Sequence, residues 1–264
     1  MMYGNPAWEH IERIRNDVNL RQWISAGHFI PLLQMTPPCE MTTQRELWHL
    51  VDRSKTVTPE RLEAIKAIEK DLAGVWARYL DSLGVVVPVE EVQSVMDRYE
   101  AIVDYLKIKF NRARPFQAAG YFGIPLYPRL RSDAYDSAYP SGHTFLALCV
   151  YHHYVTLHPD LNKELMLMVL KIKQSREDGG VHYPSDGLFA FQVYHHLKDV
   201  IFPHGHGTIG LPNDGTAYVE SPLIPDIIPV TDYVKHAREI GQGVGAVAQG
   251  EPKHMAKWYT YTLN

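Results

Sequence analysis

Residues 140–151 read PSGHTFLALCVY, and this stretch decides how the fold is built. From Thr144 onward nearly every side chain is apolar, so the pattern predicts a buried helix. Ser141 and Gly142 then lie at the N-terminus of that helix, where backbone N–H groups have no partner within the helix and bind anions. Glycine at position 142 also lets the main chain come close to a ligand. We therefore expect the helix to begin at an anion site.

Two other stretches supply positive charge for such an anion. They are Lys107-x6-Arg114-Pro115 and Ser175-Arg176-x5-His182-x3-Asp186. The guanidinium group of an arginine such as Arg114 or Arg176 can bind two phosphate oxygens at once, and Lys107 adds a point charge. These cations offset the charge that develops on a phosphoryl group in the transition state. Together with Ser141 and Gly142, they predict a phosphate-binding site.

Two histidines complete the predicted chemistry. Asp186 follows His182 by four residues, one helical turn, so its carboxylate can accept a proton from one ring nitrogen and leave the other unprotonated. His182 is therefore the candidate nucleophile, which forms a phosphohistidine intermediate. His143 directly follows the Ser-Gly donors and is the candidate general acid for the leaving oxygen. The candidate catalytic residues are thus His182, His143 and Asp186.

In this order, the three motifs resemble the signature of the type-2 phosphatidic acid phosphatase superfamily, which also contains the bacterial class A acid phosphatases and the vanadium-dependent haloperoxidases. The resemblance covers roughly residues 95–200. It rests on the run GVHYPSD at 180–186 and on Lys107, Arg114, Pro115, Pro140, Ser141, Gly142, His143, Ser175, Arg176, His182 and Asp186. It implies an all-helical bundle with a metal-free site that acts through phosphohistidine or, in the haloperoxidases, holds vanadate in the same pocket.

Each motif has a plainer interpretation when it is taken alone. Lys107, Lys109, Arg112 and Arg114 are typical of a solvated basic helix face, and a single histidine is more often structural than catalytic. The joint order and spacing of the motifs favour an active site instead.

Glu177 and Asp178, followed by two glycines, depart from the family pattern, in which many members have apolar residues or one glycine there. An acidic pair at this place would repel an anionic substrate or contact a sugar or an amine. A solvated loop between two helices is the favoured interpretation.

The composition limits the class of protein. The chain has 264 residues and is 45% hydrophobic, which is enough for a sizeable core. Its 26 basic and 30 acidic residues leave a formal net charge of −4, so nothing indicates a nucleic-acid or anionic-membrane partner. The sequence has no signal-peptide pattern and no run of the roughly 20 apolar residues that span a membrane, and Cys39 and Cys149 show no pairing pattern. We expect a soluble, cytoplasmic protein.

Helical periodicity along the chain predicts an all-α fold. The expected helices cover residues 6–25, 43–52, 58–84, 88 to the first motif, 142–158, 160–177 and 184–200. Residues 116–139 are expected to be a loop that supplies substrate contacts. Its aromatic residues either wall a pocket for a ring-bearing substrate or simply pack: Tyr121, Phe122, Tyr127, Tyr135 and Tyr139.

The predicted organisation is a single-domain helical bundle at residues 1–200, with the core motifs at 107–186 and an irregular C-terminal extension at 201–264 packed on the bundle. The run HGHG at 204–207 is more typical of a polar loop than of a metal site, because no third ligand lies near it.

The sequence therefore predicts a soluble, metal-independent hydrolase of phosphoric esters or phosphoanhydrides. Its partner would be a small phosphorylated substrate, such as a nucleotide or another small metabolite, and it would need no cofactor. Vanadate would act as an inhibitor. One alternative is a vanadium-dependent haloperoxidase with vanadate as its prosthetic group, although such enzymes are usually longer. The other is a protein that binds a phosphoryl ligand without catalysis, which would not need His143, His182 and Asp186 together.

Overall fold

The structure is a computed structural model that describes residues 8–130 and 136–203. Every regular element within these residues is a helix, so the predicted all-α fold class is confirmed for this part of the chain. In chain order the helices are α1 (Trp8–Asn16), α2 (Val18–Ser25), α3 (Ile30–Leu33), α4 (Glu40–Ser54), α5 (Pro59–Lys70), α6 (Leu72–Ser82), α7 (Val89–Phe110), α8 (Pro115–Tyr121), α9 (Gly142–Leu157), the short 3-10 helix η1 (Pro159–Leu161), α10 (Asn162–Asp178) and α11 (Pro184–Ile201).

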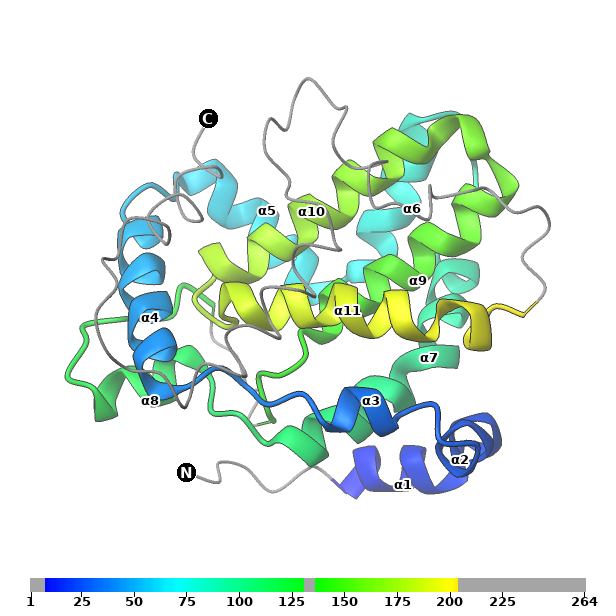
Figure 1. Cartoon of the computed structure of the whole chain (residues 1–264). Coiled ribbons are helices and arrows are strands. Elements are labelled where there is room, and N and C mark those ends of the chain that lie inside the picture. Colours follow the sequence, from blue (N-terminus) through cyan, green and yellow to red (C-terminus); the bar gives the residue numbers. More distant parts are fainter. Residues whose placement is uncertain (1–7, 131–135, 204–264) are drawn as a thin grey trace. The chain divides into compact units, whose positions relative to one another are not determined.

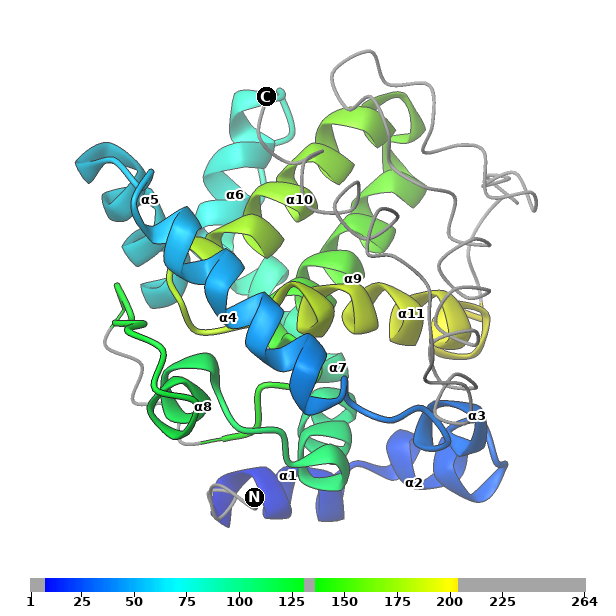
Figure 2. The ribbon, with the colours of Figure 1, turned by 60° about the vertical axis from the view of Figure 1, so that its left-hand side comes forward.

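Helix α9 lies at the centre of the bundle. It packs against α7, α10 and α11, which surround it in both views (Figures 1 and 2). Phe145, Leu148 and Val150 are completely shielded from solvent. Each large apolar side chain buried in this way stabilises the fold by about 1.5–3 kcal/mol. The apolar run that follows Ser141 and Gly142 therefore forms the core helix that its sequence predicts.

Two of the expected helices are interrupted, and an aspartate causes each break. The helix expected at 6–25 is split at Asp17, whose carboxylate accepts a hydrogen bond from the Leu20 N–H at 2.8 Å. The helix expected to run from Thr58 to Gly84 is split at Asp71, which caps α6 through the Gly74 N–H at 2.7 Å. An aspartate satisfies a free N–H at a helix start, so it begins a new helix although the apolar periodicity continues.

The expected loop at 116–139 also contains a helix, α8. Pro115 occupies its first turn, and the side chain of Gln117 accepts a hydrogen bond from the backbone N–H of Arg114 at 2.8 Å. This cap allows a seven-residue helix where glycine and aromatic residues suggested none.

The aromatic residues of this region do not behave alike. Tyr139 is buried and stacks on Phe189 with ring centroids 4.1 Å apart, and Phe122 packs against a core cluster that joins α4 and α8. Tyr121 and Tyr127 are exposed. Packing is therefore the role of Tyr139 and Phe122, whereas Tyr135 lies outside the described residues.

Nearly all of the predicted C-terminal extension, including the HGHG run at 204–207, also lies outside the described residues. Its predicted packing on the bundle stays a prediction.

Candidate active site

The three motifs meet at the N-terminal end of α9. Asn111 ends α7 in the left-handed conformation (φ 44°, ψ 46°) and turns the chain toward α8. The next residue, Arg112, then receives a backbone hydrogen bond from Ala138 at 2.9 Å. The Ser141 N–H donates to the backbone oxygen of Asp186 at 3.0 Å. Main-chain hydrogen bonds thus join the first motif to the second and the second to the third.

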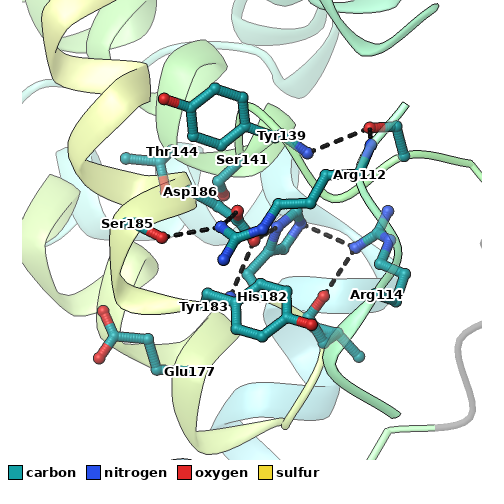
Figure 3. A network of polar contacts seen from close by, with 12 residues as sticks. Arg112, Arg114, Tyr139, Ser141, Thr144, Glu177, His182, Tyr183, Ser185 and Asp186 are labelled. Atoms are coloured by element: carbon teal, nitrogen blue, oxygen red, sulfur yellow. Dashed lines mark hydrogen bonds and ion pairs between the residues drawn. The ribbon is translucent and has the colours of Figure 1, made fainter. Parts of the chain in front are cut away.

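His182 has the geometry of a nucleophile. It is buried, and its Nδ1 lies 3.1 Å from the carboxylate of Asp186. Its Nε2 lies 2.8 Å from Nη1 of Arg114, which also donates to the Val181 carbonyl at 3.0 Å (Figure 3). Because a guanidinium group only donates hydrogen bonds, Nε2 must accept, and the ring proton belongs on Nδ1. Burial, together with Arg114 and Arg176, holds the pKa of His182 well below its usual range, so the imidazole stays neutral.

Asp186 is more than a partner of His182. It is completely buried, and its carboxylate also accepts hydrogen bonds from the Tyr183 N–H at 2.8 Å and from Arg112 Nη1 at 2.6 Å. Burial raises the pKa of Asp186 to about 7, and Glu46 adds to the rise while Arg112 opposes it. Neither Arg112 nor Glu46 belongs to the three motifs.

The predicted phosphate-binding cations all lie at this site, and two carboxylates pair with them. Asp136 forms an ion pair with Lys107 and accepts a hydrogen bond from Arg114 Nη2 at 2.5 Å. Glu69, near the end of α5, forms an ion pair with Arg176. The pKa of Asp136 is lowered although burial opposes the shift, because Lys107 and Arg114 stabilise its charge. These carboxylates hold the side chains that a phosphoryl group would contact.

Arg176 has further donors to offer. Its side chain is buried, and its Nε and Nη1 have no hydrogen-bond partner in the part of the chain that the structure describes. A buried donor without an acceptor costs about 1–3 kcal/mol. An anion bound beside Arg176 would remove this cost. The unpaired donors are thus an independent sign of a ligand site.

His143 lies beside the same group of charges. Its Nε2 is 3.6 Å from Glu69 Oε2, and 29% of its side chain remains accessible to solvent. Burial lowers the pKa of His143 well below its usual value, and Arg176, Lys107 and Arg114 add to the effect. A phosphoryl anion would neutralise these cations and thereby favour the protonated imidazole that a general acid needs.

Ser141 and Gly142 occupy the expected place but also have structural roles. Ser141 is buried, and its hydroxyl lies 2.9 Å from the hydroxyl of Thr144. A β-carbon on Gly142 would lie 3.2 Å from Cγ1 of Val103 and 3.8 Å from Nζ of Lys107. Glycine therefore allows α9 to approach α7 closely.

The prediction of a solvated loop at Glu177 and Asp178 is wrong. Both residues end α10 and are buried. Asp178 accepts hydrogen bonds from Nε of Arg53 at 2.8 Å and Nε of Arg61 at 2.5 Å, and Glu177 pairs with Lys173. Cations from α4, α5 and α10 thus compensate the buried charges. This contradicts the favoured interpretation of a solvated loop.

The suggestion of a solvated basic face is also wrong for Arg112 and Arg114, both of which are buried. The motifs gave no sign of Glu46, Glu69 or Asp136. One signal was available for Glu46, which shares the buried spacing of Leu47 and Leu50 on α4 although it is charged.

Within residues 8–130 and 136–203, no three His, Cys, Asp or Glu side chains are arranged to hold a metal ion. The arrangement instead combines a neutral imidazole, three fixed cations and a second imidazole. These groups can bind a phosphoryl group, attack it and protonate what leaves.

The sequence matches no protein-family model. It matches no curated protein either. Among solved structures, the chain is similar to a transmembrane PAP2-type phosphatidylglycerolphosphate phosphatase from Bacillus subtilis, with 17% sequence identity and a TM-score of 0.44 over 65% of this chain and 90% of that one. In the described part of this chain, no helix is long and apolar enough to cross a bilayer.

Proposed function

We propose that this protein is a phosphatase that hydrolyses a small phosphorylated substrate through a phosphohistidine intermediate on His182. The observation that carries the proposal is the state of the His182 ring, whose Nε2 accepts a hydrogen bond beside three cations while Nδ1 faces Asp186. A ring held neutral with a lone pair on Nε2 is a nucleophile. The unpaired donors of Arg176 supply a place for the oxygens of the group under attack.

The first half of the reaction transfers the phosphoryl group. Arg114 moves its hydrogen bond from Nε2 of His182 to a phosphoryl oxygen, and Nε2 attacks phosphorus. The bond from phosphorus to the leaving oxygen breaks as the N–P bond forms. His143 gives its proton to that oxygen. In the second half, His143 takes a proton from water, and the water oxygen attacks phosphorus. The N–P bond breaks, inorganic phosphate departs, and His182 is regenerated.

The finer assignments belong to the same proposal. A nucleotide or another small metabolite is the proposed substrate, and the protein is proposed to be soluble and cytoplasmic. We also propose that no metal ion takes part, because Lys107, Arg114 and Arg176 supply the positive charge that a phosphoryl transition state requires.

Phosphate release should be measured over nucleotides, sugar phosphates and lipid phosphates. The wild type should hydrolyse at least one class, and His182→Ala should abolish turnover of it. A quench in base during turnover should leave phosphate attached to His182. His153→Ala, which removes another histidine of α9, is the matched control and should retain activity. Phosphate on a serine, or on no residue, would exclude the mechanism.

Two reagents separate this proposal from the alternatives. Vanadate adopts the five-coordinate geometry of the transition state and should inhibit hydrolysis competitively, while EDTA should leave the rate unchanged. Strong halide oxidation with vanadate and peroxide but negligible phosphate release would favour a haloperoxidase. Phosphate binding without turnover of any substrate would favour a binding protein.

A further inference from the structure

Arg112 is a buried arginine outside the three motifs, and it connects the third motif to α4. Its Nη1 donates to Asp186 at 2.6 Å and to the Ser185 hydroxyl at 2.7 Å, and its Nη2 donates to Glu46 at 2.9 Å. Figure 3 shows its guanidinium group beside Ser185 and Asp186. The group also lies 3.8 Å from the ring centroid of Tyr183. Arg112 is therefore held on several sides, which fixes where it points.

Glu46 completes this arrangement from α4. Its carboxylate is buried and accepts hydrogen bonds from the Ser185 N–H and the Ser185 hydroxyl, both at 2.8 Å. It thus holds both Arg112 and the first turn of α11, which carries Asp186. These three hydrogen bonds offset the cost of burying the carboxylate.

We propose that Arg112 and Glu46 are positioning residues that keep Asp186 ionised and so fix the proton of His182 on Nδ1. The inference rests on the proposed function and deepens it. Neither residue touches the substrate. Arg112 stabilises the charge of Asp186, and Glu46 orients Arg112 while its own charge limits that stabilisation. The pair together sets the pH at which the nucleophile becomes competent.

The charged groups around Asp186 determine the direction in which each substitution should shift its pKa. The charged and titratable groups that face it are Arg112 after α7, Glu46 on α4, Tyr139 before α9, and His182 and Tyr183 before α11. Arg112 is the cation among these groups, and it lowers the pKa of Asp186, whereas Glu46 raises it. Removing the two charges should therefore move the ionisation of Asp186 in opposite directions. A purely structural role predicts no such opposition.

The rate of nitrophenolate release from nitrophenyl phosphate in the first turnover isolates this ionisation, because that step precedes the attack of water and its leaving group needs no proton from His143. For the wild type, the rate should rise with pH through the pKa of Asp186, at about 7. Arg112→Gln should shift the midpoint of this rise to a pH higher by about 1–3 units, and Glu46→Gln should shift it to a pH lower by about one unit. Arg112→Lys keeps the charge and should stay near the wild type. Lys109→Gln removes an exposed charge from the end of α7 and is the matched control.

The ¹⁵N chemical shifts of the His182 ring test the same inference without catalysis. In the wild type, the ring proton should stay on Nδ1 at pH values above the midpoint of the rise in rate. In Arg112→Gln this preference for Nδ1 should be lost at pH 7. If Arg112→Gln fails to fold, the direction of the Glu46→Gln shift decides. The inference would be overturned if both variants kept the wild-type midpoint of the pH–rate profile and the wild-type ¹⁵N shifts of His182, even if their rates were lower. Absence of hydrolysis in the wild type, with the ring shifts as expected, would instead overturn the proposed function alone.

Discussion

Replacing Asp136 with asparagine should make the protein bind inorganic phosphate more tightly. Asp136 pairs with Lys107 and with Arg114, and a phosphoryl group must displace it from both. Asparagine keeps an oxygen of the same reach but removes the charge. The two cations then lose their internal competitor, while their positions are disturbed little.

The magnitude follows from the hydrogen bonds that change. A bond to a charged group contributes about 1.5–3 kcal/mol, and a neutral acceptor gives roughly half of that. The loss over two bonds is therefore about 1.5–3 kcal/mol. Solvent screens this difference little, because the Asp136 side chain is only 16% exposed. We expect phosphate to bind roughly 10- to 100-fold more tightly.

Isothermal titration calorimetry with phosphate measures this change directly, and the inhibition constant of phosphate checks it during turnover. Asp52→Asn is the matched control, because Asp52 pairs with Lys55 on the exposed surface. Its affinity for phosphate should equal that of the wild type. Unchanged or weaker binding by Asp136→Asn would refute the idea that this carboxylate occupies the place of the ligand.

Two further predictions concern the leaving group and the fold. In the first turnover, His143→Ala should slow release of the alcohol from alkyl phosphates by about 10²–10⁴-fold but leave release of nitrophenolate from nitrophenyl phosphate far less affected, and equal losses in this step would contradict a general acid. Arg53→Met leaves the buried charge of Asp178 with Arg61 alone and should lower the free energy of unfolding by about 3 kcal/mol in urea titrations. Lys55→Met breaks an exposed pair and should change it by less than about 1 kcal/mol, so similar losses in the two variants would count against the buried network.

Much of the bundle could be predicted because its signals are local. The apolar run of α9 and the four-residue spacing of His182 and Asp186 are both visible in the sequence, and each needs only one helix to be interpreted. The breaks at Asp17 and Asp71 were missed, although they are local too. The apolar periodicity hid them, since a capping aspartate and an exposed helical aspartate look alike in a sequence.

The charge partners could not be predicted because they come from distant parts of the chain. Arg53 and Asp178 are separated by 125 residues, and Arg112 and Glu46 by 66. Nothing in the spacing of charged residues says which pairs will meet inside a bundle. A motif identifies the groups that would contact a ligand. It does not identify the opposite charges that compensate these groups when they are buried.

The pairing of Arg112 with Glu46 and of Arg176 with Glu69 limits how far this chain can be shortened. A chain trimmed to begin at Val89 would retain every motif residue and the helices that carry them. It would nevertheless leave the buried Arg176 without the carboxylate of Glu69, and it would leave Arg112 with Asp186 but without Glu46. A buried charge that loses its partner costs several kcal/mol. The shortest piece of this chain that keeps the site intact should therefore extend back to α4, and grafting the motifs onto another helical scaffold should fail unless both glutamates are included.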